Sequence, residues 1–470
     1  MVASNEIEFG AELKSVQPLK RRVFRAGSWT LVGHFAALVL RLASSIVLTR
    51  IFSPEVFGLL AILLALNTLL AVLTDIGLRQ AVVQSPNAGN ARFLHTAFAI
   101  QVLRGIFVWG LCLLVAGVLL IARRAELLPS ESVYAQPLLP ELLVVTSLSS
   151  VILGFTSMRT YTATRDLRLG RLTVIDLLSF VAGQIFIVGL GLLTRSIWSY
   201  IAGLILTATL TVLLGHIWLR GSKDGFAWDK AALRELSHFG RWIFFSSAVS
   251  ATILNGDRMF LSALLSPAEL GLYSIANNLV SVPDALASKM FSSVAMPTLS
   301  EVNRSQPDRF ASLLSRMRWL SDSLLMFIAG FLFASGEAIV RLIYDPRYAD
   351  AGWMLQLLAI GLVFARYNIA GSAYMALGRP QYLTAVAIIR SISLFAFLAI
   401  GFFVLGTRGA IVGIGLHMLP STLYMLYCNR RLGLLDLRLE ILMIPVLIAG
   451  WLVGHGANAV ALTVGHLIHG

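Results

Sequence analysis

Two stretches of the chain share one pattern: residues 48–58 read LTRIFSPEVFG, and residues 261–271 read LSALLSPAELG. The two stretches start 213 positions apart, at 48 and at 261. In this register Leu, Ser-Pro and Gly coincide, and Gly27 and Trp29 also fall on Gly240 and Trp242 without a gap. Self-similarity at one fixed spacing indicates an internal repeat. In each copy the Ser-Pro-x-x-x-Gly element predicts a tight turn that opens a new helix.

The composition places this repeat in a membrane. Of the 470 residues, 57% are hydrophobic and 13% are charged, and the mean hydropathy is +0.80. A soluble domain carries about 25% charged residues, and disordered chains are poor in apolar residues. A large soluble protein and a disordered chain are therefore both excluded. The two cysteines, Cys112 and Cys428, lie in or beside apolar runs and predict no disulfide framework.

The apolar runs predict an all-α polytopic membrane protein with about fourteen transmembrane helices. Twelve runs are long, and a weaker pair at the end could instead be a re-entrant hairpin. The twelve are 27–51, 56–75, 95–121, 138–158, 172–194, 197–219, 239–264, 270–296, 315–343, 351–376, 382–404 and 409–428, and the pair is 440–453 and 457–469.

The basic residues predict the orientation. The net charge is +13, from 37 Lys and Arg against 24 Asp and Glu. Most of the basic residues fall in loops that alternate onto one side, as in the cluster Arg304, Arg309, Arg316 and Arg318. Cytoplasmic loops collect Lys and Arg, so this excess predicts a multi-pass protein of the cytoplasmic membrane with both termini inside, rather than a nucleic-acid partner.

The repeat divides the predicted helices into two pseudo-symmetric six-helix lobes around a central cavity. We expect an N-lobe at 25–220 and a C-lobe at 238–430, which enter the membrane in the same orientation. This plan is typical of transporters that bind substrate between the halves. The remaining segments are a cytoplasmic N-terminal segment at 1–24, a cytoplasmic linker at 221–237 and a C-terminal hairpin at 431–470.

Polar groups at membrane depth are the candidate site. Ionisable residues there are costly and mark a pathway by default. Arginine in particular suits the bidentate binding of phosphate or carboxylate. The alternative for the hydroxyl and amide groups is ordinary bonding between helices. The cavity candidates are His34, Arg41, Ser45, Arg104, Arg258, Asn277, Ser281, Asp284, Arg366 and Arg390.

Three further acids, Asp176, Asp257 and Asp322, are candidates for coupling to an ion. The sequence contains no Walker A, GxSxG, HExxH or CxxC motif. We therefore expect no enzymatic activity, no metal and no cofactor.

Several soft motifs, taken in order, are similar to a known family. They are 27–58, with the turn quoted above, DIGLRQ at 75–80, DRMFLS at 257–262, LGLY at 270–273, MPTLS at 296–300 and ALGR at 376–379. Over about residues 20–432 the chain resembles oligosaccharide flippases. These form the polysaccharide transporter branch of the multidrug/oligosaccharidyl-lipid/polysaccharide exporter superfamily.

The resemblance implies two six-helix lobes, often with two further helices. It also implies a substrate: an isoprenoid-diphosphate-linked oligosaccharide moved from the inner to the outer leaflet for polysaccharide biosynthesis. Membrane lipids and other polysaccharide-assembly proteins are the expected partners. Two alternatives stay open. One is a membrane-embedded glycan polymerase or glycosyltransferase, and the other is an ion-coupled exporter of small molecules.

Overall fold

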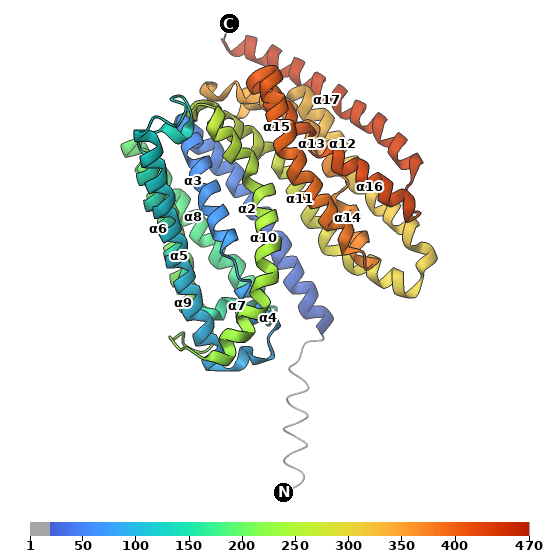
Figure 1. Cartoon of the computed structure of the whole chain (residues 1–470). Helices are drawn as coiled ribbons and strands as arrows, with labels where there is room; N and C mark the ends of the chain where they lie inside the picture. Colours follow the sequence, from blue (N-terminus) through green and yellow to red (C-terminus); the bar gives the residue numbers. More distant parts are fainter. Residues whose placement is uncertain (1–18, 470) are drawn as a thin grey trace.

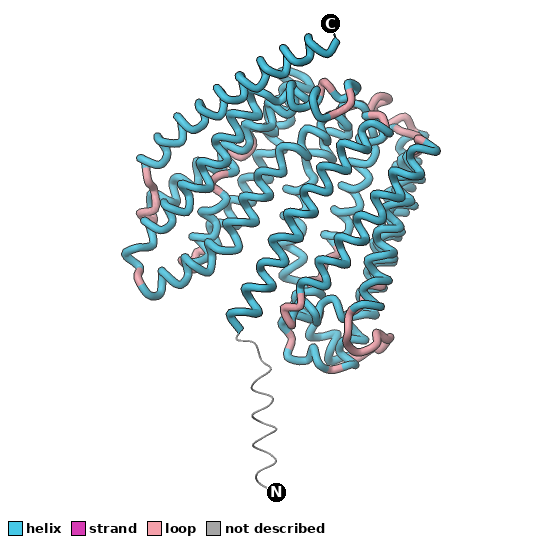
Figure 2. The backbone as a smooth tube through the Cα atoms, turned by 180° about the vertical axis from the view of Figure 1, so that it is seen from behind, coloured by secondary structure: helices cyan, strands magenta, loops and turns pink. Residues whose placement is uncertain are grey.

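The computed structural model describes the backbone of residues 19–469, and every element in that range is helical. Side chains are described for residues 27–236, 253, 255–290 and 295–459. The predicted N-terminal segment 1–24 lies mostly outside the described residues. Figure 1 shows long helices arranged side by side, and Figure 2 shows that only short loops join them. The prediction of an all-helical protein is confirmed.

The first half of the chain, residues 25–220, contains six long helices and several short ones. Short polar side chains begin many of them: Asn90, Ser157 and Ser196 each accept a hydrogen bond from a backbone N–H in the first turn. The elements are α2 (Leu19–Ile51), α3 (Pro54–Leu73), α4 (Leu78–Gln84), η1 (Pro86–Gly89), α5 (Ala91–Arg124), η2 (Val133–Ala135), α6 (Leu139–Gly154), α7 (Met158–Arg165), α8 (Leu169–Thr194) and α9 (Ile197–Trp218).

The second half, residues 238–430, is also helical, and one further helix comes after it. Ser266 and Glu269 form a capping box at the start of α11. The elements are α10 (Lys230–Leu264), α11 (Pro267–Ser305), η3 (Pro307–Arg309), α12 (Phe310–Ile343), η4 (Pro346–Tyr348), α13 (Ala351–Ala365), α14 (Asn368–Ala376), α15 (Pro380–Leu416), α16 (Leu419–Arg431) and α17 (Leu437–His469). The predicted linker 221–237 therefore includes the first turns of α10.

In the described part of the chain, nine helices are long and apolar enough to cross a bilayer, or ten if the bent pair α6–α7 is one span. One of the nine, residues 380–431, covers two predicted spans, because Leu405 and Gly406 leave helical geometry between them. The predicted spans 239–264 and 270–296 are the helices α10 and α11.

The fourth predicted span of each half is interrupted. In the first half α6 ends at Gly154 and α7 begins at Met158, with a bend of 60° between them. In the second half α13 ends at Ala365 and α14 begins at Asn368. Asp224, in the segment between α9 and α10, accepts hydrogen bonds from the Ser157 hydroxyl (2.5 Å) and the Met158 backbone N–H (2.9 Å). The linker thus fixes the start of α7.

The predicted C-terminal pair 440–453 and 457–469 is wrong, because both segments belong to the single helix α17. Two of the glycines that suggested a break, Gly450 and Gly454, are packing positions, whereas Gly456 meets open space. A methyl group on Gly450 or Gly454 would overlap the backbone of Phe327 or Phe331 in α12. Small residues of this kind let helices approach closely in a membrane.

These contacts show that α17 runs parallel to α12. The end of α17 therefore lies at the opposite end of the molecule from the start of α2, as Figure 1 shows. The prediction that both termini lie on one side depended on the hairpin, and the single helix removes that basis.

The repeated turns quoted above meet each other in space. A methyl group on Gly58 would overlap the carbonyl oxygen of Pro267, and one on Gly271 would overlap that of Pro54. The first turns of α3 and α11 therefore touch backbone to backbone, in a reciprocal contact. Figure 1 shows α2, α3, α10 and α11 between α5, α6, α8 and α9 on one side and α12–α17 on the other.

Further contacts join the halves at the end where α2 meets α3, which we call the α2–α3 end. Arg347 of η4 donates to the carbonyl oxygens of Thr49 (3.1 Å) and Arg50 (3.3 Å), the last turn of α2. The Tyr348 hydroxyl donates to the carbonyl oxygen of Phe52 at 2.9 Å. Arg347 also lowers the pKa of Asp345, chiefly through the hydrogen bond between their side chains. At the α2–α3 end, the two halves are therefore joined by hydrogen bonds from the charged Arg347 and from Tyr348 to backbone carbonyl oxygens.

Replacing Gly58 with alanine tests the reciprocal contact. Gly58→Ala places a methyl group against the backbone of α11, and overpacking of this kind costs about 1–3 kcal/mol. We expect a lower unfolding temperature of the purified protein in detergent. Gly117→Ala in α5, where the added methyl group meets open space, is the matched control and should leave it unchanged or slightly raised. Equal effects of the two changes would contradict the assigned contact.

Candidate functional site

A cavity opens at the seam between the halves, between α2 and α11. Its volume is about 320 Å³. Most of the lining is apolar, and the polar members are His34 of α2 and Lys289 of α11. The other lining residues are Leu31, Val32, Phe35, Leu286 and Met290. Val32, Phe35 and Met290 are exposed, so the cavity opens onto an apolar surface.

Positive charge gathers at this seam. Lys289 and Arg41 both lie close enough to interact electrostatically with His34. The buried Nε2 atom of His34 has no hydrogen-bond partner among the described residues. Arg41 is exposed and forms no ion pair within the described part of the chain. Lys289 and His34 thus line a cavity that has no carboxylate in its lining, and Arg41 lies within electrostatic range of His34.

Other predicted residues of the first half lie apart from the cavity. Ser45 shares a hydrogen bond of 2.9 Å with the hydroxyl of Tyr344, across the two halves. Asp176 is exposed on α8, where it interacts with Arg79.

Arg104 is not a free cation. It forms an ion pair of 3.5 Å with Asp75 and donates to the carbonyl oxygen of Ala71 at 2.6 Å. It therefore stabilises the carboxyl end of α3. The prediction assumed a free guanidinium because no acid lies on the same helix, and the acid lies at the end of a neighbouring helix.

On α10 and α11 some of the predicted polar residues have hydrogen-bond partners within the described chain, and others have atoms without one. Asp257 accepts a short hydrogen bond from the hydroxyl of the buried Tyr273. Arg258 is half-buried, and its Nε atom has no partner within the described chain. Asn277 is half-buried, whereas Ser281 is exposed and bonds to the carbonyl oxygen of Asn278 in its own helix.

Asp284 and Arg390 belong to one polar cluster, which Asn368 joins together. The Asn368 side chain accepts a hydrogen bond from Arg390 (2.8 Å) and donates one to Asp284 (3.4 Å). Arg390 also donates to the Ser421 hydroxyl at 3.2 Å. We call Asp284, Asn368, Arg390 and Ser421 the Arg390 cluster. It connects α11, α14, α15 and α16.

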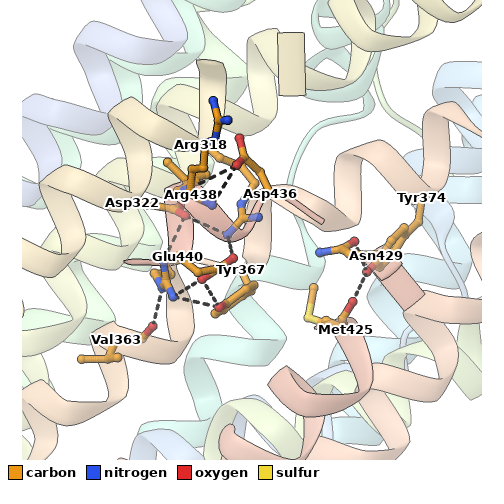
Figure 3. A network of polar contacts seen from close by, with 12 residues as sticks. Arg318, Asp322, Val363, Tyr367, Tyr374, Met425, Asn429, Asp436, Arg438 and Glu440 are labelled. Atoms are coloured by element: carbon orange, nitrogen blue, oxygen red, sulfur yellow. Dashed lines mark hydrogen bonds and ion pairs between the residues drawn. The ribbon is translucent and has the colours of Figure 1, made fainter. Parts of the chain in front are cut away.

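Arg366 and Asp322 are not exposed to a cavity. Both are buried, at 7% and 0% exposure, and they lie 3.4 Å apart. Arg318 binds Asp322 at 2.9 Å and Glu440 of α17 at 2.8 Å, and Arg366 binds Glu440 at 2.5 Å. Figure 3 shows this group with the Tyr367 hydroxyl directed at Glu440. We call Arg318, Asp322, Arg366, Tyr367 and Glu440 the Glu440 network.

Three members of this network are absent from the predicted site residues. Arg318 was assigned to a basic loop cluster, yet it is 1% exposed inside α12. Glu440 is the first residue of the weak apolar run 440–453, and neither it nor Tyr367 is among the predicted site residues. An Arg and an Asp four residues apart at the start of a predicted span, 318 and 322, were the available signal.

Comparison with known proteins gives the family. Residues 47–352 match the family described as "Polysaccharide biosynthesis protein". The chain belongs to this family. It is also 22% identical over 410 residues to the lipopolysaccharide biosynthesis protein WzxC of Escherichia coli (strain K12), across 86% of this chain and 80% of that protein. The resemblance seen in the sequence is confirmed.

Two solved structures share the fold. One is an inward-facing transporter of the MATE family, within the MOP superfamily, with a TM-score of 0.65, 13% identity and coverage of 86% of this chain and 94% of that one. The other is the lipid II flippase MurJ in an inward closed conformation, with a TM-score of 0.65, 14% identity and coverage of 93% and 98%. The chain is therefore a multi-span membrane protein of polysaccharide biosynthesis with this transporter fold.

Replacing Arg366 separates the buried network from surface ion pairs. Arg366→Ala leaves the buried Asp322 and the half-buried Glu440 facing one arginine, and breaking a buried pair costs about 3–5 kcal/mol. We expect a marked fall in unfolding temperature in detergent. Arg341→Ala, which removes an exposed ion pair with Glu337, should cost less than about 1 kcal/mol. A stable Arg366→Ala variant would contradict the buried network.

Proposed function

We propose that the protein is a flippase, which moves an isoprenoid-diphosphate-linked oligosaccharide from the inner to the outer leaflet of the cytoplasmic membrane. The observation that carries this proposal is the cavity between α2 and α11. Its lining combines exposed apolar side chains with His34 and Lys289, and Arg41 lies nearby. A lipid with an anionic headgroup and an apolar chain complements this arrangement, because the headgroup can meet the basic groups and the chain can meet the apolar surface.

Each part of the substrate has a counterpart in this arrangement. Lys and Arg replace the hydration of a diphosphate, and the guanidinium can bind it through two parallel hydrogen bonds. The isoprenoid chain can stay in the bilayer beside Val32, Phe35 and Met290. Arg258, whose Nε atom is buried and unpaired within the described chain, is the next basic group proposed to meet the diphosphate.

Alternating access is the proposed mechanism. The contacts of Ser45, Arg347 and Tyr348 join the halves at the α2–α3 end, which is the outer end if the N-terminus is cytoplasmic. The α2–α11 cavity lies closer to the start of α2, toward the inner end. A state that is closed at the outer end and accessible from the inside accepts substrate from the inner leaflet. Breaking the contacts at the α2–α3 end while the inner end closes would then release the substrate outside.

The observations favour this function over the two alternatives. A polymerase or glycosyltransferase needs a base or a metal site, and the sequence offers no such motif. An exporter of cationic drugs needs acidic groups in its site, whereas this seam carries basic ones. The relative WzxC is a lipopolysaccharide biosynthesis protein, which agrees with a part in moving a glycan precursor.

A transport assay tests the proposal. The probe is lipid-linked oligosaccharide extracted from cells that lack this chain, labelled on its sugar with a fluorophore that an impermeant reagent quenches. In proteoliposomes the wild-type chain should move the label between leaflets. Arg41→Gln, Lys289→Gln and Arg258→Gln should each slow this by about tenfold, the value of one charge-assisted hydrogen bond.

Arg123→Gln, at an exposed position near the end of α5, is the matched control and should transport normally. Normal rates in all three seam variants would overturn the assigned site. Growth of the glycan chain on the probe would instead identify a polymerase.

Topology gives an independent prediction. With a cytoplasmic N-terminus, a cysteine introduced at position 227 should resist an impermeant thiol reagent in intact cells. Cysteines introduced at position 129 and in a short tag after residue 470 should react, because the single helix α17 crosses once. Labelling at 227 with protection at 129 would show that the orientation is reversed.

A further inference from the structure

We infer that Glu440 of α17 is a positioning residue for the Arg390 cluster and acts on it through the interruption between α13 and α14. This inference rests on the proposed function, because the Arg390 cluster includes Asp284 of α11, the helix that also carries Lys289 of the proposed site. Two polar groups, the Glu440 network and the Arg390 cluster, meet at three consecutive residues, Arg366, Tyr367 and Asn368. The first two belong to the network and the third to the cluster.

The local sequence does not explain the interruption. Kinks in helices usually arise at Pro, at Gly or Ser pairs, or where a side chain enters the hydrogen-bond ladder. Residues 362–370 contain no Pro, Gly or Ser. At the interruption the Arg366 N–H reaches the Leu362 carbonyl oxygen at only 3.4 Å, and the Tyr367 N–H bonds three residues back, to Phe364, at 3.2 Å. Arg366 and Tyr367 keep right-handed helical dihedral angles, so the interruption is one tighter turn, and what distinguishes it is the set of contacts that its two side chains make with other helices.

Glu440 supplies that tertiary contact. Its Oε2 atom accepts hydrogen bonds from Arg366 Nη2 (2.5 Å) and from the Tyr367 hydroxyl (2.6 Å). Arg366 Nη2 also donates to the Tyr367 hydroxyl at 2.8 Å, which closes a triangle of three polar groups. One carboxylate oxygen of α17 thus binds the side chains of both residues that form the interruption, and Figure 3 shows the Tyr367 hydroxyl beside Glu440.

Because Arg366 and Tyr367 are held in place, the position of the next residue, Asn368, is fixed as well. It begins α14, and its amide group lies between Arg390 and Asp284. Arg390 has one other side-chain partner among the described residues, the Ser421 hydroxyl. If the interruption shifts, Asn368 moves and both charged groups lose their shared partner. Glu440 therefore sets the geometry of a polar cluster that it does not touch.

The charges of the network allow positioning to be separated from stability. Arg318 and Arg366 balance Asp322 and Glu440, so Glu440→Gln leaves one unmatched buried positive charge. Glu440→Gln combined with Arg318→Gln restores neutrality and keeps the Arg366–Asp322 pair. The double variant still lacks the carboxylate that holds Arg366 and Tyr367. A charge-balancing role predicts full recovery in the double variant, and a positioning role predicts recovery of stability alone.

The experiment measures three quantities in the full chain: the unfolding temperature in detergent, the transport rate, and the reaction rate of a cysteine at Ser288→Cys. Ser288 is exposed and lies 3.4 Å from Asp284, so the reactivity of this thiol reports the charges of the Arg390 cluster. The native Cys112 and Cys428 are buried and can stay. Glu337→Gln, on the exposed surface of α12, is the matched control.

We expect Glu440→Gln to lower the unfolding temperature, to cut transport about tenfold, as loss of a charge-assisted hydrogen bond does, and to change the thiol rate about threefold or more. The double variant should regain the unfolding temperature while transport and thiol rate stay altered. Recovery of all three quantities would overturn the inference, and so would an unchanged thiol rate in Glu440→Gln. If the wild-type chain transports nothing, the proposed function fails, whereas the thiol rates still decide whether Glu440 positions the cluster.

Discussion

Close backbone contact between the first turns of α3 and α11 is the constraint on which the rest of the structure depends. Lipid tails are as apolar as the helices, so a bilayer offers no hydrophobic drive for helices to associate, and packing must supply it. Gly58 and Gly271 allow each helix to reach the backbone of the other. The partners of Tyr344, Arg347 and Tyr348 on α2 lie at the same end of the molecule, where the two halves are held together.

The helices could be predicted well because each is marked by a continuous run of apolar residues. The site could be predicted less well because it depends on contacts between residues distant in the sequence. Apolar runs and Ser-Pro turns mark α2, α3, α10 and α11 directly. Glycine has two meanings, however, and in α17 it marks close packing where a break was predicted. Arg104 pairs with Asp75, in the segment after α3, and Arg366 pairs with Glu440 of α17. A pairing between segments distant in sequence leaves no periodic trace.

Burial separates the arginines into two kinds. Arg318 and Arg366 are enclosed with two carboxylates, and the desolvation of such a group is tolerated only when its charges match. Arg41 is exposed beside a cavity that has no acid in its lining, so its charge remains available to a ligand. The same residue type thus fastens helices in one half and offers a binding group at the seam.

The order in which the chain is synthesised determines when the charges of the Glu440 network become balanced. Asp224 is synthesised directly after the first half, so the start of α7 gains its cap before the second half exists. Glu440 lies in the last helix, and until α17 inserts, Arg318 and Arg366 share only Asp322 within the network. Domains generally fold as synthesis proceeds. Insertion of α17 is therefore the step that balances the charges of the Glu440 network, and the maturation of the second half waits until α17 has been synthesised.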